Sequence, residues 1–139
     1  IQDMTDKVLG AQAGSSGYLN FEGQPELLKN RVKDQKANQY QSFNEALIDL
    51  KNDRIDALLI DRVYANYYLQ SEGILNDYSV FSAGFESEAF AVGVRPADKT
   101  LLAALNQAFI SLYQEGKFQE ISQKWFGEDV ATSQVKNQE

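Results

Sequence analysis

The sequence predicts an α/β fold with a mostly parallel sheet flanked by helices, and three observations carry this prediction. Short apolar runs alternate with segments whose apolar residues recur at helical spacing. The run IDALLI (55–60) is nearly all apolar but too short for an independent helix, which is typical of a buried parallel strand. The order strand, helix, strand, helix, strand favours parallel strands joined by right-handed crossovers.

The first half of the chain supplies the expected sheet. Ser42 and Glu45 form a capping box in front of a helix whose apolar residues lie on one face. Pro25 fits the first turn of a short helix. The expected elements are a strand at 7–12, helices at 16–23 and 25–32, a strand end at 39–40, a helix from Ser42, a strand at 55–60 and a helix at 63–69.

The second half is expected to be mainly helical after two β-like segments at 78–82 and 88–94. Pro96 and Asp98 mark a helix start, and the helix bodies are expected at 101–115 and 117–126. Glycines at 116 and 127 end these helices, and the polar tail 128–139 is expected to be frayed.

The stretch KVLGAQAGSSGY (7–18) predicts a binding turn between the first strand and the first helix. Gly14 and Gly17 allow backbone angles that a Cβ would forbid. Ser15 and Ser16 supply hydroxyls, and the first N–H groups of a helix attract a negative charge. Such a turn suits a small anion, either a phosphate or a carboxylate.

The phosphate alternative is the weaker one, because the stretch has neither GxxxxGK[ST] nor GxGxxG. A plain strand-to-helix turn with serine caps is the simplest reading of the same residues. Asp61 follows the strand at 55–60, and ligands of open parallel sheets bind beyond the carboxyl ends of the strands. An anion site and a carboxylate at one edge complement a zwitterion. Asp61 can also be only the N-cap of the next helix, and the two roles are compatible.

Composition narrows the function classes. The net charge of −7 argues against nucleic acid or an anionic membrane as partner. Without cysteine or histidine, thiol chemistry, histidine-based catalysis and the usual zinc sites are excluded, and no metal or cofactor is expected. No apolar run approaches the length of a membrane span. Hydrophobic residues make up 43% of the chain, so a packed core rather than disorder is expected.

Four stretches resemble one protein family. They are VLGAQAGSSGY (8–18), FNEALIDLKNDRIDALLIDRVYANYYL (43–69), AFAVGVRP (89–96) and LLAALNQAFISLYQEGKFQEISQKWFG (101–127). Together they are similar, in order and spacing, to the second lobe and C-terminal return of polar amino-acid binding proteins. These are the family 3 solute-binding receptors of ABC importers, with a type II periplasmic binding protein fold. The resemblance covers most of the chain.

The resemblance implies a site. In that family two lobes close on one amino acid, and the second lobe binds the α-carboxylate with a turn that matches Gly14, Ser15 and Ser16. An aspartate that matches Asp61 takes the α-ammonium. Gln12, at the end of the first strand, matches a position of common side-chain contacts.

The resemblance also implies a domain organisation. Residues 1–91 correspond to the second-lobe ligand-binding domain, 92–127 to the hinge return and helices that pack on the first lobe, and 128–139 to a polar tail. The chain opens abruptly before its first strand and matches no first lobe, so a mature fragment is expected. That lobe brings an arginine for the carboxylate. The arginines present lie in other contexts, and Arg62 is expected to be solvated rather than to tune side-chain preference.

We therefore expect an extracytoplasmic amino-acid binding module without catalysis, which delivers its ligand to an ABC permease. Membrane contact is expected only through the permease or a lipid anchor outside this chain. The alternatives are an enzyme on the same scaffold, such as a cyclohexadienyl dehydratase-like protein, or a sensory input domain. The helices from 98 to 126 present an apolar face, which predicts a homodimer or a domain swap.

Overall fold

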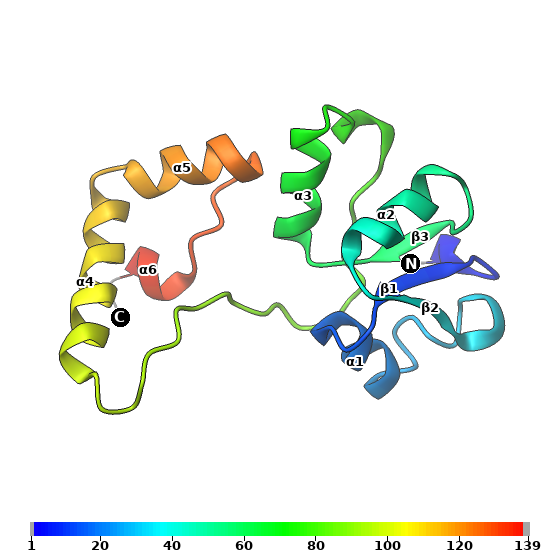
Figure 1. Ribbon diagram of the computed structural model, residues 1–139, viewed down its shortest axis with the longest axis horizontal. Helices are drawn as coiled ribbons and strands as arrows, with labels where there is room; N and C mark the ends of the chain where they lie inside the picture. The colour runs from blue at the N-terminus through cyan, green and yellow to red at the C-terminus, as the bar shows by residue number, and fades with distance from the viewer. Residues whose placement is uncertain (1, 138–139) are drawn as a thin grey trace. The chain divides into compact units, whose positions relative to one another are not determined.

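The computed structural model describes residues 2–137 and divides into two compact units (Figure 1). Unit 1 runs to Ala65 and includes Ser79–Glu86, whereas unit 2 comprises Asn66–Tyr78 and continues from Ser87. This division differs from the expected segments 1–91, 92–127 and 128–139, which concern packing inside a longer protein and remain a prediction. The helices and strands are β1 (Leu9–Gln12), α1 (Ser16–Gly23), β2 (Ala37–Tyr40), α2 (Phe43–Lys51), β3 (Ala57–Leu59), α3 (Arg62–Ser71), α4 (Lys99–Gln114), α5 (Lys117–Phe126) and α6 (Ser133–Asn137), with short 3₁₀ turns at Gln2–Met4, Lys33–Gln35 and Leu75–Asp77.

Unit 1 is built on a sheet of three parallel strands in the order β2-β1-β3, which confirms the predicted α/β fold. The central strand β1 pairs with both neighbours, with Leu9 opposite Ala37 on one side and opposite Ala57 on the other. All three strands therefore end at one edge, which we call the carboxyl edge, and begin at the opposite amino edge.

The two faces of β1 explain how the helices pack. Leu9 and Ala11 are fully buried on one face, in a cluster that includes Phe21 of α1. Gly10 points to the other face, where an added Cβ would lie 2.5 Å from Cδ1 of Ile55, so a larger side chain would force that isoleucine to move. Figure 1 shows α1 and α2 on opposite sides of the sheet, in agreement with this alternation.

The predicted cap of α2 is present, with one difference in detail. Ser42 Oγ accepts a hydrogen bond from the Glu45 N–H at 3.3 Å. Glu45 Oε2 accepts from the Gln41 N–H at 3.1 Å, one residue before the N-cap, instead of from Ser42 itself. The two bonds fix the turn between β2 and α2, and therefore the end of β2.

The expected helix at 25–32 is wrong. This segment is a succession of turns, in which the Leu27 N–H donates to the Gln24 carbonyl and the Asn30 N–H donates to the Pro25 carbonyl. Leu28 and Val32 are both buried in the core of unit 1. The turns place these two side chains inside without regular helical bonding, so packing outweighs local propensity here.

The expected strands at 78–82 and 88–94 are also wrong, since neither segment pairs with a described strand. A strand is stabilised by its ladder of hydrogen bonds, and the described sheet contains only β1, β2 and β3. In the second segment two large apolar side chains are left in water: Phe90 is 75% exposed and Val92 is 53% exposed.

Unit 2 holds the two long C-terminal helices at nearly the predicted bounds. Gly116 and Gly127 both adopt φ of 75°, the left-handed backbone expected where a helix ends or turns. The tail, expected to be frayed, contains the short helix α6. Among the described residues, no helix combines the length and apolar character needed to cross a membrane.

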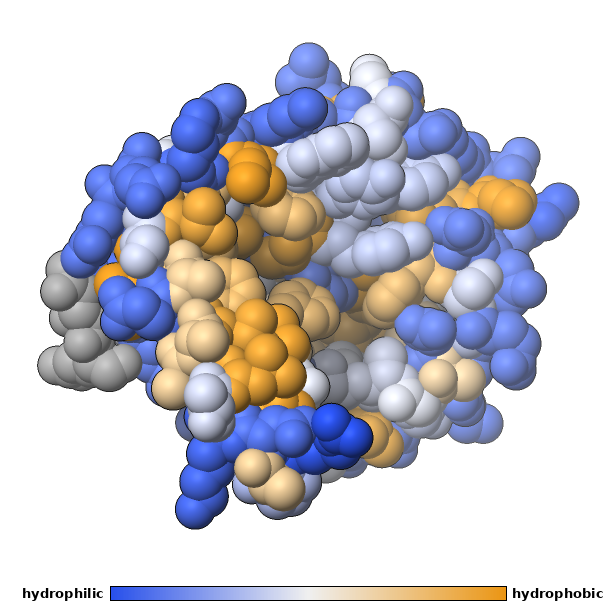
Figure 2. Space-filling view, turned by 60° about the vertical axis from the view of Figure 1, so that its left-hand side comes forward, coloured by the Kyte–Doolittle hydropathy of each residue, from blue (hydrophilic) through white to orange (hydrophobic). Residues whose placement is uncertain are grey.

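The helices of unit 2 bury little apolar surface. No described residue of α4 is buried, and in α5 the buried residue is Ser122. Figure 2, with the side that carries α4 and α5 turned forward, shows a broad hydrophobic area at the surface. The exposed large apolar residues of these two helices are Leu101, Leu102, Leu112, Ile121 and Trp125.

Candidate functional site

The carboxyl edge gathers the residues that the sequence singles out. The strand register sets Ala11 opposite Leu59 and Gln12 opposite Tyr40. The glycine turn follows β1 directly, and Asp61 stands two residues after the end of β3. Because the strands are parallel, the turn and Asp61 leave the sheet at the same edge, within unit 1.

The glycine turn opens α1 at its N-terminus. Gly14 has φ of 70°, a backbone conformation that residues with a Cβ rarely adopt. Ser15 is the N-cap: its Oγ accepts from the Tyr18 N–H at 3.1 Å and donates to the Gln12 carbonyl at 2.9 Å. The serine-cap alternative is therefore correct for Ser15.

The cap formed by Ser15 leaves other backbone N–H groups of the turn available to a ligand. Ser16 is exposed, and within residues 2–137 no acceptor is found for the backbone N–H groups of Ser16 and Gly17. A helix start with unpaired N–H groups attracts an anionic ligand, because these groups carry the positive end of the helix dipole. The geometry of the turn suits a carboxylate or another small anion.

Asp61 caps the helix that follows β3. Its Oδ1 accepts from the Tyr64 N–H at 2.9 Å, and its carbonyl accepts from the Ala65 N–H at 2.9 Å. The cap alternative is therefore correct for Asp61 as well. The side chain is exposed, and a carboxylate has further acceptor sites beyond one cap bond, so a ligand role is compatible with the cap.

Gln12 is half-buried, and its side chain ties β1 to the end of β2: Nε2 donates to the Gln41 carbonyl at 3.2 Å. Sequence reasoning did not anticipate a second connection at this edge. Tyr64 packs its ring against Phe43 and donates its hydroxyl to Asn44 Oδ1 at 3.3 Å. The available signal was the pair of aromatic residues in the first turns of two successive helices.

Hydrogen bonds to the carboxylate of Asp49 stabilise the packing of β2 against α2 beside the site. The Tyr40 hydroxyl donates to Asp49 Oδ2 at 2.9 Å, and Arg54 donates to the other carboxylate oxygen at 2.8 Å. The bonds from Arg54 and Tyr40 lower the pKa of Asp49. Burial and the adjacent Asp49 raise the pKa of the Tyr40 hydroxyl. The tyrosine thus stays protonated and keeps donating, which fixes the last residue of β2 to α2.

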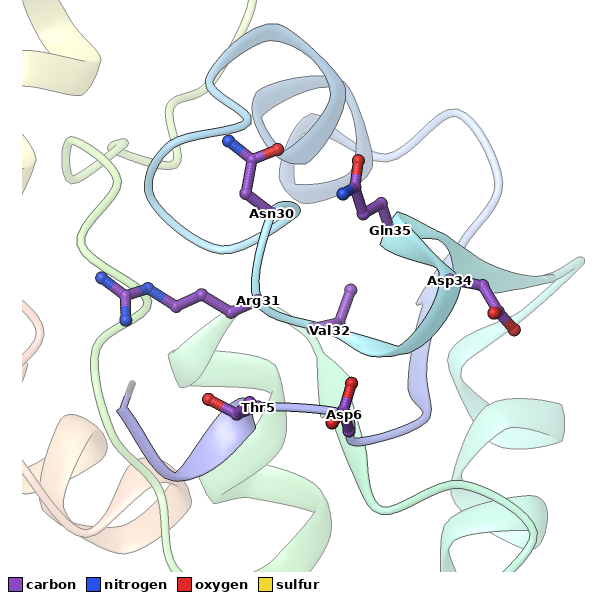
Figure 3. Close-up of a pocket in the computed structure, with 7 residues that line it drawn as sticks. All are labelled: Thr5, Asp6, Asn30, Arg31, Val32, Asp34 and Gln35. Atoms are coloured by element: carbon purple, nitrogen blue, oxygen red, sulfur yellow. The ribbon is translucent and has the colours of Figure 1, made fainter.

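The amino edge has a different character. A shallow cavity of about 450 Å³ lies there, and Figure 3 shows Arg31 and Asp34 pointing outward on opposite sides of it. The residues before each strand include four side-chain-bearing positions with positive φ, namely Asp6, Asp34, Gln35 and Asp53. The lining residues are Thr5, Asp6, Asn30, Arg31, Val32, Asp34 and Gln35. None of the sequence-predicted site residues belongs to this cavity.

No metal site accompanies either edge in the described part of the chain, where no group of three or more acidic side chains is placed to hold an ion. The sequence has no histidine or cysteine. The chemistry available at the carboxyl edge is therefore that of backbone N–H groups, hydroxyls, an amide and one carboxylate, which suits binding by hydrogen bonds and charge.

Comparison with known sequences identifies relatives. ABC transporter arginine-binding protein 1 of Escherichia coli K12 is 30% identical over 128 residues, which cover 89% of this chain and 49% of the relative. L-cystine-binding protein TcyJ of the same strain is 30% identical over 125 residues, which cover 90% of this chain and 45% of the relative. The chain thus spans about half the length of these relatives.

Two solved structures share the fold. A Streptococcus pneumoniae ABC uptake transporter substrate-binding protein with bound histidine is 73% identical, with a TM-score of 0.79, over 94% of this chain and 53% of that one. A polar amino acid ABC uptake transporter substrate-binding protein from Streptococcus thermophilus is 59% identical, also with a TM-score of 0.79, over 99% of this chain and 52% of that one.

The sequence profile of one family matches residues 26–128. This match covers most of the chain and agrees with the relatives and structures above, which are binding proteins. The resemblance found in the sequence is confirmed: the chain belongs to the bacterial extracellular solute-binding proteins, family 3.

Proposed function

We propose that this chain forms one lobe of an extracytoplasmic receptor that binds an amino acid for an ABC importer. The observation that carries the proposal is the strand register, which brings the start of α1 and the carboxylate of Asp61 to one edge. In the proposed complex, the N–H groups of Ser16 and Gly17 bind the α-carboxylate. Asp61 binds the α-ammonium, and Gln12 lies where it can contact the ligand side chain.

Histidine is the first ligand to test. The structure with 73% identity to this chain contains bound histidine, whereas the curated relatives named for arginine and cystine are 30% identical. In our proposal a second lobe closes over the ligand by a hinge motion and excludes water from these contacts. The closed receptor then docks on its permease, and the chain itself catalyses no reaction.

Asp61 offers the sharpest test, because its cap role and its charge can be separated. Asparagine caps a helix about as well as aspartate does, but carries no charge. In a receptor of the relatives' full length, Asp61→Asn should weaken histidine binding by about 2 to 5 kcal/mol, since the ammonium would be desolvated without its partner. The measurement is calorimetric titration, with the exposed aspartate of Asp77→Asn in unit 2 as control.

The outcomes are distinct. A loss below about 0.5 kcal/mol for Asp61→Asn would show that Asp61 serves only as a cap. Equal losses for Asp61→Asn and Asp77→Asn would show a general effect of net charge. Titration of arginine and cystine in parallel would show whether histidine is the preferred ligand.

The 139-residue chain alone should bind free amino acids poorly. One lobe supplies one side of the contacts and leaves the ligand open to water, where charge pairing is weak. No thermal shift is expected with histidine, arginine or cystine at about 1 mM, a concentration well above the dissociation constant that a closed receptor needs. A clear response at micromolar ligand would contradict the two-lobe mechanism.

A further inference from the structure

Tyr64 connects Asp61 to a second helix. Its backbone N–H donates to Asp61 Oδ1 at 2.9 Å. Its ring lies 5.1 Å from the ring of Phe43, centroid to centroid, at an angle of 38°. Its hydroxyl donates to Asn44 Oδ1 at 3.3 Å. One residue therefore joins the candidate carboxylate to the first turn of α2 through both main chain and side chain.

The connection continues to the end of β1. Ser42 caps α2, and the Gln41 carbonyl, next to it, accepts from the side chain of Gln12. Gln12 in turn precedes the glycine turn, and its carbonyl accepts from Ser15 Oγ. The three strand ends are thus tied together by side chains as well as by the sheet, all within unit 1.

The cap of α3 lies at an exposed position and needs such support. Asp61 and Arg62 are exposed, and first turns of helices fray readily. When the first turn opens, the Tyr64 N–H leaves Asp61, and the carboxylate gains rotamers that do not serve the ligand. A half-buried ring held by Phe43 and Asn44 opposes this opening, because the first turn cannot unwind without breaking both contacts.

We propose that Tyr64 is a positioning residue, which acts with Asn44 to hold Asp61 in the orientation that binds the ligand ammonium. The inference rests on the proposed function of Asp61 and extends it to two residues outside the predicted site. The cap occupies Oδ1 of Asp61, and the second carboxylate oxygen is left for the ligand. Tyr64 itself touches no ligand in this proposal.

The first experiment needs no ligand. Hydrogen exchange of the residue-64 amide is measured by NMR in the 139-residue chain and in Tyr64→Phe, Asn44→Ala and the double variant. Each single change should speed exchange about threefold or more, as expected for loss of one hydrogen bond. The double variant should add nothing further. The Tyr18 amide, which Ser15 Oγ caps in α1, is the internal control and should not change.

The second experiment measures histidine affinity in the full-length receptor. Tyr64→Phe and Asn44→Ala should each weaken binding about two- to tenfold. Neither change should have an effect in the Asp61→Ala background, because the residues act through Asp61. Tyr113→Phe is the matched control, since it removes a tyrosine hydroxyl bonded to an aspartate in unit 2.

Two results would overturn the proposal. One is unchanged exchange at residue 64 in both single variants. The other is an affinity loss that persists in full when Asp61 is alanine, which indicates a purely structural role for Tyr64. If the full-length receptor binds no histidine, arginine or cystine, the proposed function fails, whereas the exchange measurement still decides whether Tyr64 holds the cap.

Discussion

The two units of this chain differ in how much apolar surface they bury. Unit 1 has a closed core around Phe21, which is fully buried, whereas Leu69 is the one buried hydrophobic residue of unit 2 in the described chain. Helices α4 and α5 are regular and end at glycines, yet five of their large apolar residues stay exposed. Regular secondary structure therefore does not by itself show that a segment buries its apolar surface.

The candidate site and the exposed apolar residues of α4 and α5 lie in different units. All sequence-predicted site residues lie in unit 1, on strand ends that the core and the side-chain ties hold in register. We infer that the carboxyl edge keeps its geometry whatever covers unit 2. The predictions that follow test this contrast, from the largest expected effect to the smallest.

The largest effect is expected in the core of unit 1. Phe21→Ala should lower the free energy of unfolding by about 3 to 5 kcal/mol, because a fully buried ring is replaced by a cavity. Leu101→Ala in α4, at a side chain that is 50% exposed, should cost less than about 0.5 kcal/mol. Urea unfolding followed by circular dichroism measures both. Equal losses would show that unit 2 is packed in solution.

The second prediction concerns association. We expect two copies of the 139-residue chain to cover each other's α4 and α5 faces, or to exchange elements through the connection 90–98, because burial of each large apolar side chain contributes about 1.5 to 3 kcal/mol. Leu101→Lys or Ile121→Lys should each raise the dissociation constant about tenfold or more. Light scattering at micromolar concentration decides the matter, with Gln107→Lys in α4 as control. A clean monomer of 15.6 kDa for the unmodified chain would contradict this prediction.

The third prediction compares two helix starts. Ser15 caps α1 with a side-chain hydrogen bond, whereas Asp98 at the start of α4 makes no such bond. Ser15→Ala should therefore cost about 1 kcal/mol of stability, and Asp98→Ala only a few tenths, including its exposed ion pair with Arg95. Hydrogen exchange in the first turns of α1 and α4 measures each locally. A larger effect at Asp98 would reverse the comparison.

The smallest effect is a pH dependence at the amino edge. The Val8 N–H donates to Asp56 and lowers its pKa, with Lys7 adding to the effect. The folded chain thus favours the carboxylate, so this contribution to stability is complete above the ordinary pKa of 3.8 and is lost as the pH falls through the lowered value. Urea midpoints at about pH 6 and pH 3 should differ less in Asp56→Asn than in the unmodified chain. The same difference in both proteins would assign the acid loss to other carboxylates.

Apolar spacing, helix caps and glycines predicted the parts of the fold that depend on neighbouring residues in the sequence. The apolar spacing and the Ser42 cap predicted the start of α2 to within a residue, and the glycines predicted the ends of α4 and α5. The parallel sheet followed from the alternation of strands and helices. The predictions for 25–32, 78–82 and 88–94 failed because these segments depend on partners distant in sequence. The first is shaped by core packing, and the other two lack a paired strand among the described residues.

The same division applies to the site. Gly14, Ser15 and Asp61 could be selected from sequence because turn and cap chemistry is local, and the parallel order places them at one edge. Their binding role remains a prediction. Tyr64 was not selected: the aromatic residues in the first turns of both helices were a signal, but its contact with Asn44 joins residues 20 positions apart in different helices. Single-sequence patterns do not report such pairs.

The strained backbone of the amino edge has a consequence for engineering. Left-handed backbone angles, which glycine or asparagine adopts at lower cost, occur at Asp6, Asp34, Gln35 and Asp53. Replacement by glycine relieves the backbone strain but increases the conformational entropy of the unfolded chain. Replacement by asparagine relieves strain with little such loss. These positions precede the strands, and the candidate ligand contacts follow them. A designer could therefore add stability at one end of the sheet and use that reserve to accept destabilising changes of ligand preference at the other end.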